Sequence, residues 1–515
     1  MQKKYTLQEF CDIVAEKNMF QTQIIEPFLR AIQKFSDRNA FYIDEEFFTY
    51  KHLEESISKI RFQLIDNQDD IVGLVANDDL ETYASIFALW VEGKAYIPLE
   101  PTAPAERNQT IIEQANIKTI LNSSDDLQLV ENRNTISTKN LKPVELKHQD
   151  ILFKEISDQK MAYILFTSGS TGTPKGVPIT RENLACFVEA FWKTGYDIDH
   201  TDRCLQMFEL TFDLSIMSYL IPLLKGACVY TIPKNRIKYS YIFELMDEHE
   251  LTVALMVPSM LNYLRPYFDE IDCPKMKYSM FCGEPLYQSI TDEWAKCIPN
   301  AKIDNVYGPT EDTIFCTVYT YNRNGVNETK NDILSIGKAM YNNYIDVFDE
   351  ENNMVNAGEI GELCLSGKQL TQGYINNEKL NQEKFFVKEL SGEKIRFYRT
   401  GDLCIRNITG NFDFIERKDS QVKIQGYRIE LGEIEYHCRV FLKEINAIAL
   451  PFNNKTNNME IALFVETDEK NIDLDKLKEY LYAKIPAYMI PTKYYFMSKF
   501  PVNSSDKIDR ETFAK

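Results

Sequence analysis

Residues 163–176, YILFTSGSTGTPKG, have the composition of a phosphate-binding loop. The apolar run at 163–166 predicts a buried strand, which leads into small hydroxyl and glycine residues with one lysine. Glycines let several backbone N–H groups face one anion, and the hydroxyls and the lysine add donors and positive charge. A Gly/Ser-rich loop alone is more often a linker, but the preceding strand and the density of donors favour a phosphate site. The predicted contacts are Thr167, Ser168, Gly169, Ser170, Thr171, Gly172 and Lys175.

A second residue of interest is Asp213, which interrupts the apolar stretch at 210–224. Burying an unpaired carboxylate costs several kcal/mol, so this side chain needs a partner. One interpretation of the local sequence is a helix N-cap, since aspartate is favoured there and an apolar run follows. The local sequence does not identify a partner for this carboxylate.

Alternating strand and helix patterns predict the sheets that hold these residues. Residues 71–101 read as strand, helix and strand, a βαβ unit that indicates a parallel sheet with crossover helices. Residues 276–285 and 301–317 each read as a strand followed by a turn, and ligands usually bind where such turns meet at one sheet edge. Residues 395–403 predict a strand that ends in a polar turn. Beyond residue 420 we expect a small α+β unit, which begins with a strand at 422–429.

Composition limits the class of protein. The chain has 515 residues, 44% of them hydrophobic, which predicts two or more domains. No apolar run approaches the ~20 residues that cross a bilayer, and the N-terminus lacks the apolar stretch of a signal peptide, so we expect a cytoplasmic protein without membrane insertion. The 11 cysteines show no CxxC pairs, which argues against disulfides and zinc. The net charge of −19 argues against a nucleic-acid partner.

Five motifs, in order along the chain, resemble those of the adenylate-forming (ANL) superfamily. They are TSGSTGTPKG at 167–176, YGPTE at 307–311, YRTGD at 398–402, RKDSQVKIQGYRIE at 417–430 and DKID at 506–509. FDLS and FCGE, which begin at Phe212 and Phe281, are most similar to the amino-acid-activating branch. That branch includes the adenylation enzymes of nonribosomal peptide synthetases and the D-alanine:D-alanyl carrier protein ligases, which the chain resembles most.

The resemblance implies an α/β fold in two parts. A large N-terminal adenylation core with mostly parallel sheets flanked by helices would span residues 1–416. A small mobile α+β lid domain would span residues 417–515 and turn about a hinge near Asp419. Lys507, in the DKID motif, matches the catalytic lysine of the superfamily.

The resemblance also implies a nucleotide site, with ATP and Mg²⁺ as cofactors. Tyr307 would stack on adenine, and Asp402 would bridge the two ribose hydroxyls with its carboxylate oxygens. Glu311 would help to hold Mg²⁺, which prefers oxygen ligands. The other adenine and ribose contacts would be Gly283, Glu284, Asn305, Gly308, Thr310 and Arg417.

In the amino-acid-activating branch the position of Asp213 pairs with the ammonium group of the substrate. The pocket beyond it, aligned by motif, would be apolar and partly bulky, which predicts a small uncharged amino acid. Cys282 matches the D-alanine ligases, so D-alanine is the first choice, with glycine, L-alanine or another small apolar amino acid as the alternative. The aminoacyl group would pass to the phosphopantetheine thiol of a separate carrier protein. The lining residues would be Leu214, Met217, Leu255, Met280, Cys282, Val306, Ile314 and Phe315.

Two other hypotheses remain. An acyl-CoA synthetase would use the same first step with a carboxylic acid and CoA, but it would not need Asp213. A degenerate nucleotide-binding module is suggested by two departures from the superfamily pattern. Glu416 stands where a glycine is usual, and Ser505–Asp506 stand where Asn-Gly is usual. ATP turnover would exclude this module.

Overall fold

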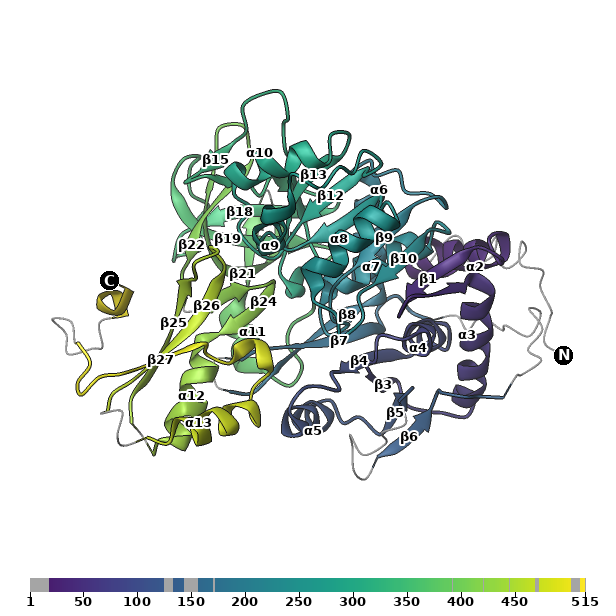
Figure 1. Cartoon of the computed structure of the whole chain (residues 1–515), viewed down its shortest axis with the longest axis horizontal. Coiled ribbons are helices and arrows are strands. Elements are labelled where there is room, and N and C mark those ends of the chain that lie inside the picture. Colours follow the sequence, from purple (N-terminus) through teal and green to yellow (C-terminus); the bar gives the residue numbers. More distant parts are fainter. Residues whose placement is uncertain are drawn as a thin grey trace.

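The protein consists of a large N-terminal body and a smaller C-terminal unit (Figure 1). The computed structural model describes residues 18–124, 133–142, 156–169, 172–390, 392–419, 421–443, 445–467, 472–501 and 510–514. The expected α/β fold with a small α+β C-terminal unit is confirmed. None of the helices in these ranges has the length and apolarity needed to cross a bilayer.

A six-stranded sheet positions the predicted phosphate loop. Its order is β6-β5-β3-β4-β7-β8, and all neighbours are parallel except β7 and β8. The expected βαβ unit is β3-α4-β4. Only Glu81 on α4 is not buried, because this apolar helix packs on both sides. The bounds are β3 (Ile71–Val75), α4 (Leu80–Val91), β4 (Ala95–Leu99), α5 (Ala105–Gln114), β5 (Thr119–Asn122), β6 (Asn134–Ser137), β7 (Met161–Thr167) and β8 (Lys175–Thr180).

A nine-stranded sheet, in the order β17-β14-β13-β12-β11-β9-β10-β1-β2, forms the second layer. Because β12 and β13 are adjacent and parallel, the turns that follow them share one edge, as expected. Its strands are β1 (Asn39–Ile43), β2 (Glu46–Thr49), β9 (Arg203–Gln206), β10 (Cys228–Thr231), β11 (Val253–Met256), β12 (Tyr278–Phe281), β13 (Lys302–Tyr307), β14 (Thr317–Thr320) and β17 (Lys338–Ala339). The helices around it are α2 (Glu26–Lys34), α3 (Tyr50–Leu64), α6 (Arg181–Lys193), α7 (Asp213–Leu223), α8 (Lys238–Glu248), α9 (Ser259–Leu264) and α10 (Gln288–Cys297).

A third, antiparallel sheet carries Asp402 and Arg417. The expected turn at Asp402 is wrong, because β21 continues past this residue and pairs it directly with Arg417 on β22. Ladder hydrogen bonds to β19 and β22 keep this polar stretch extended. The elements are β15 (Thr329–Lys330), β16 (Ile333–Leu334), β18 (Asn343–Phe348), β19 (Ile360–Gly367), α11 (Glu378–Lys384), β20 (Phe385–Leu390), β21 (Glu393–Arg406) and β22 (Phe412–Arg417), with β15 and β16 forming a separate pair.

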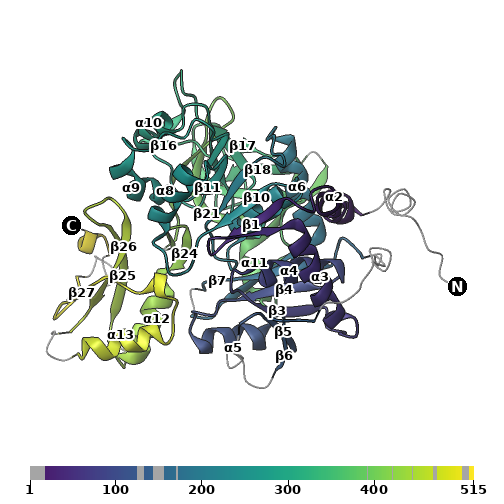
Figure 2. The same ribbon diagram turned by 45° about the vertical axis from the view of Figure 1, so that its right-hand side comes forward.

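The C-terminal unit has its own hydrophobic core and stands beside the body in Figure 2. The single strand expected at 422–429 is wrong. It is a hairpin, β23 and β24, because Gln425 (φ 52°) and Gly426 (φ 82°) turn the chain in the left-handed region. The described elements are β23 (Gln421–Ile424), β24 (Tyr427–Glu430), α12 (Leu431–Phe441), β25 (Ala447–Asn453), β26 (Met459–Val465), α13 (Leu474–Tyr482) and β27 (Lys493–Phe496).

Candidate nucleotide and amino-acid site

A cavity of about 410 Å³ lies at the carboxyl ends of β12 and β13, between the N-terminal body and the C-terminal unit. The C-terminal unit contributes Val422, Lys423, Leu450 and Arg510 to its walls, among other residues. Several predicted site residues line it: Gly283, Glu284, Asn305, Val306, Tyr307, Asp402, Arg417 and Asp419. The structure therefore gathers most of the predicted adenosine contacts around one cavity.

A hydrogen-bonded network joins Tyr307, Asp402 and Arg417 in this cavity. The Tyr307 hydroxyl donates to Asp402 Oδ2 at 2.5 Å, and Arg417 Nη1 donates to Asp402 Oδ1 at 2.8 Å. Burial alone would raise the pKa of Asp402, but Arg417, Lys423 and Tyr307 together hold it below its usual value. Asp402 is therefore an ionised acceptor at neutral pH. Arg417 also pairs with Asp419 at 2.6 Å, so it connects the cavity to the expected hinge.

Hydrogen bonds or close packing fix three further predicted contacts, which lie on β13 or in the turns after β12 and β13. Asn305 donates its amide to the carbonyls of Leu334 and Ser335 at 3.2 and 2.9 Å. Gly308 must be glycine, because a Cβ there would lie 2.4 Å from the Cα of Phe315. Glu284 accepts from the backbone N–H groups of Ser259, at 2.8 Å, and Gly426, at 3.1 Å.

The phosphate loop follows β7, as predicted, and contacts the C-terminal unit. Ser168 donates to the carbonyl of Arg428 at 2.7 Å. The N–H of Gly169 donates to Glu433 at 3.3 Å, and Lys175 pairs with Glu430 at 2.9 Å. Acidic side chains therefore occupy the donors that were predicted to bind phosphate.

Four other residues were predicted to bind phosphate in this loop, and two of them are described by the structure. Thr167 Oγ1 is buried and has no hydrogen-bond partner among the described residues. Gly172 has a φ of +77°, and a Cβ there would lie 2.8 Å from the ring of Tyr436 on α12. Ser170 and Thr171 lie outside the described residues, as does Lys507.

Glu311 is completely buried and ionised. Burial would raise its pKa, but Arg428 at 2.7 Å, the hydroxyl of Tyr374 at 2.6 Å and nearby Lys175 bring the pKa to about 2. An ionised carboxylate oxygen suits Mg²⁺. The described residues contain no cluster of three or more His, Cys, Asp or Glu side chains that could hold a metal ion. Glu311 is the residue that would hold a Mg²⁺ ion here.

Asp213 is the first residue of α7, and Phe212 occupies the N-cap position without a side-chain capping bond. The N-cap interpretation is therefore wrong. Asp213 is buried, and its Oδ2 has no hydrogen-bond partner among the described residues. Burial raises its pKa to about 7, and the Thr310 hydroxyl limits this rise. A cationic group at this oxygen would favour the carboxylate.

The residues predicted to line the substrate pocket are all buried. Leu255 on β11 and Met280 on β12 are paired in register. Cys282 follows β12, and burial raises the pKa of its thiol to about 12, with a further contribution from the charge of Asp213. The remaining residues come from α7, from β13 and from the turn after Asp312, and all are less than 5% exposed: Leu214, Met217, Val306, Ile314 and Phe315.

The hairpin β23–β24 and the start of α12 contribute charged groups that the sequence reasoning missed. Lys423 lines the cavity, and its Nζ lies 5.4 Å from the ring centroid of Tyr307. Arg428, Glu430 and Glu433 pair with three predicted nucleotide-binding groups. For the first three the available signal was the charge of the RKDSQVKIQGYRIE motif, in which only Arg417 and the hinge at Asp419 were assigned.

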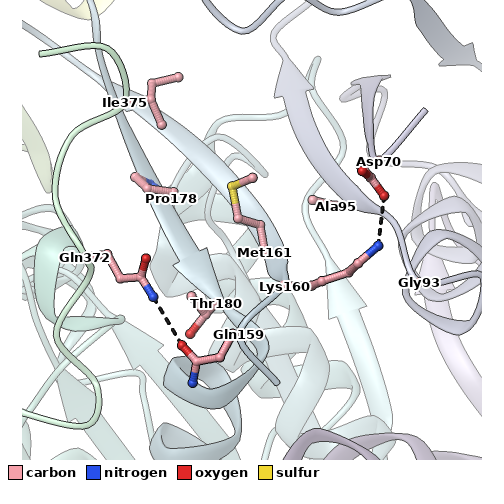
Figure 3. Close-up of a pocket in the computed structure, with 10 residues that line it drawn as sticks. All are labelled: Asp70, Gly93, Ala95, Gln159, Lys160, Met161, Pro178, Thr180, Gln372 and Ile375. Atoms are coloured by element: carbon pink, nitrogen blue, oxygen red, sulfur yellow. Dashed lines mark hydrogen bonds and ion pairs between the residues drawn. The ribbon is translucent and has the colours of Figure 1, made fainter. Parts of the chain in front are cut away.

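A second cavity, of about 240 Å³, lies at the amino ends of β4 and β7 (Figure 3). Met161 and Ile375 give it apolar walls, and an exposed ion pair between Lys160 and Asp70, at 2.9 Å, lies at its rim. None of the predicted site residues lines it. The cavity of about 410 Å³, which the predicted residues line, is therefore the candidate site.

Comparisons with known proteins identify a family and similar folds. Residues 28–375 match the family model described as AMP-binding enzyme. Zwittermicin A synthase ZmaJ from Bacillus cereus is 31% identical over 96% of this chain and 95% of its own length. Tyrocidine synthase 1 from Brevibacillus parabrevis is 28% identical over 93% of this chain, which spans 44% of that protein. The fold is similar to that of the Vibrio cholerae adenylation domain AlmE in complex with glycyl-adenosine-5'-phosphate, with a TM-score of 0.83, 24% identity and 95% and 97% of the two chains covered.

Proposed function

This chain belongs to the AMP-binding enzyme family, and we propose that it activates a small amino acid as aminoacyl-AMP and transfers it to a carrier-protein thiol. The observation that carries this proposal is Asp213. Its buried Oδ2 has no partner among the described residues, and the apolar side chains predicted to line the pocket are also buried. A substrate ammonium group would supply the missing charge. A carboxylic acid without an ammonium group, as an acyl-CoA synthetase would bind, leaves this oxygen unpaired.

The size of the side chain is proposed from the pocket. Met280 and Phe315, two of the residues predicted to line it, are completely buried and bulky, which favours a small substrate side chain. D-alanine is our first choice, and glycine, L-alanine or another small apolar amino acid is the alternative. The glycyl adenylate in the AlmE complex supports a small substrate. The buried Cys282 is the feature that favours the D-enantiomer.

In the first half-reaction an oxygen of the amino-acid carboxylate attacks the α-phosphorus of ATP. The bond to the β-phosphate oxygen breaks, so aminoacyl-AMP and pyrophosphate form. Lys175 and the N–H groups of the loop hold the outer phosphates, and Lys507 stabilises the charge between the reacting groups. Tyr307 and Asp402 hold the adenosine. Bound Mg²⁺ would neutralise phosphate charge, with Glu311 as its ligand from this chain.

In the second half-reaction the carrier thiol attacks the aminoacyl carbonyl carbon. AMP leaves with the anhydride oxygen, and the thiol loses its proton. We propose that residues 1–416 form the core and residues 417–515 a lid that turns about Asp419 between the half-reactions. The separate hydrophobic core of the C-terminal unit supports this division, although β22 extends through Arg417, one residue beyond the expected boundary.

ATP–pyrophosphate exchange tests this proposal. We expect exchange to depend on Mg²⁺. When both enantiomers of each amino acid are tested, exchange should be fastest with D-alanine or another small apolar amino acid. Loading of a phosphopantetheinylated carrier protein should follow, and CoA should not replace the carrier. Exchange with fatty or aryl acids and no response to any amino acid would contradict the proposal, as would a preference for large or charged side chains.

A further inference from the structure

The turn at residues 312–315 has an unusual backbone. Thr313 and Ile314 have φ values of 51° and 75°, so two consecutive residues with β-branched side chains lie in the left-handed region. Such residues adopt this conformation only where the surrounding structure imposes it. The turn follows Glu311 directly and carries Ile314 and Phe315, two of the predicted substrate-pocket residues.

The side chain of Gln369 is hydrogen-bonded to the main chain of this turn. It is completely buried, and its Nε2 donates to the carbonyl oxygens of Asp312, Thr313 and Phe315 at 3.2, 3.3 and 3.0 Å. An amide nitrogen has two hydrogens, so these three carbonyls share one donor group. Asn343 donates to Oε1 of Gln369 at 2.7 Å and thereby fixes which end of the amide faces the turn.

The segment around Gln369 is fixed separately. Asn183 at the start of α6 donates to the carbonyls of Lys368 and Leu370 at 2.7 and 3.2 Å. The N–H of Thr371 donates to the carbonyl of Glu311 at 2.8 Å. Glu311 therefore has its own backbone support, while three carbonyls of the turn take hydrogen bonds from the amide of Gln369. The Thr313 hydroxyl also donates to the main-chain carbonyl of Gln369, a bond that does not use the amide.

We propose that Gln369 is a positioning residue that sets the shape of the amino-acid pocket. It acts through the turn at 312–315 and places Ile314 and the ring of Phe315, which packs edge-on against Phe187 at 5.0 Å. Because it lies behind the turn, it does not touch substrate. The inference rests on the proposed function, since it assigns selectivity for the side chain of the activated amino acid.

The test is Gln369→Met, which keeps the volume of the side chain and removes the N–H donors. The catalytic efficiency for the preferred small amino acid should fall about tenfold to hundredfold, because small displacements in a binding site have large effects. Valine and leucine should lose less, so the preference for small side chains relaxes. The KM for ATP should stay within about threefold of the wild type, since Glu311 keeps its own support. Equal loss for all amino acids and for ATP would overturn the proposal.

Matched variants separate this effect from a general loss of folding. Gln372→Met changes an exposed glutamine three residues away, whose side chain donates to Gln159 beside the smaller cavity (Figure 3). This variant should leave selectivity unchanged. Asn343→Leu removes the donor that fixes the amide, and it should give a weaker version of the Gln369→Met effect. Relaxed selectivity in Gln372→Met, or wild-type selectivity in both other variants, would overturn the proposal.

Hydrogen exchange tests the positioning without reference to the substrate. The amides of residues 313–316 should exchange faster in Gln369→Met than in the wild type, while the amides of β12 and β13 keep their protection. This result would stand even if the wild type activated no amino acid, in which case the proposed function would fail and the positioning would remain. Unchanged exchange at 313–316 in a folded variant would reject the positioning role itself.

Discussion

The two ends of the candidate nucleotide site differ in the partners of their charged groups. At the phosphate end the C-terminal unit supplies partners: Glu430 pairs with Lys175, Glu433 accepts from Gly169, and Arg428 pairs with Glu311. At the other end the adenosine contacts surround a cavity of about 410 Å³, and Asp213 keeps a buried oxygen without a partner among the described residues.

This difference identifies the step for which the arrangement is suited. The carboxylates of Glu430 and Glu433 bind Lys175 and the N–H of Gly169, the groups that we propose hold the outer phosphates of ATP. Arg428 likewise takes the carboxylate oxygens of Glu311 that a Mg²⁺ ion would need. The cavity beside Tyr307 and Asp402 stays open. With the roles proposed above, the arrangement would accommodate a nucleoside monophosphate but compete with a triphosphate.

The largest expected effect separates the two half-reactions. Lys507→Ala should slow adenylate formation at least about 10²-fold, because a positioned cation that stabilises developing charge contributes this much. Transfer from supplied aminoacyl-AMP to the carrier should persist, since pyrophosphate no longer has to leave. Pyrophosphate exchange and a carrier-loading assay measure the two steps. Equal loss of both would show that one arrangement serves both half-reactions.

A similarly large effect is expected at Asp213. Asp213→Asn should weaken amino-acid binding about 100-fold, because a buried ammonium group would lose its counter-charge, while ATP affinity changes little. The wild type should also respond to pH. Since the pKa of Asp213 is about 7, the carboxylate fraction rises as pH increases from 6 to 8, and binding should strengthen about tenfold over this range.

The pH effect has a direct control. Protonation at low pH removes the negative charge that the ammonium group needs, so affinity falls as pH falls through 7. The asparagine variant has no such charge to lose, and its amino-acid affinity should be nearly flat over the same range. A steep pH profile in Asp213→Asn would assign the titration to another group.

The sequence predicted the elements of the site better than the contacts between its two parts. The strand and loop at 163–176 and the turns after β12 and β13 follow from local patterns of apolar, glycine and polar residues. The pairing of Lys175 with Glu430 joins residues 255 positions apart, and no local pattern encodes it. The hairpin turn was missed because Gln425 gives no sign of a positive φ. Gln369 was missed because a buried glutamine and an exposed one read alike in a sequence.

A moderate effect is expected from neutralising the two carboxylates at the phosphate end. In the double variant Glu430→Gln/Glu433→Gln, the C-terminal unit competes less with the outer phosphates, so the KM for ATP in pyrophosphate exchange should fall about tenfold. Transfer from supplied aminoacyl-AMP should slow, because the arrangement with the hairpin at the loop becomes less populated. Glu479→Gln, at an exposed position of α13, is the matched control and should change neither step. A double variant that weakens ATP binding would contradict the competition.

The smallest effect concerns the open end. Glu416 is exposed, lines the cavity and precedes Arg417, so its negative charge lies near the place proposed for the nucleotide. Exposed charges interact weakly across water, so Glu416→Gln should tighten ATP and AMP binding only about twofold. Added salt should remove this difference in affinity, because salt shortens the Debye length. Titration of AMP at low and at high ionic strength measures both quantities. A loss of affinity in Glu416→Gln that persists in high salt would instead mean that the carboxylate binds the nucleotide directly. The adenosine end would then depend on an acidic residue, just as the phosphate end does.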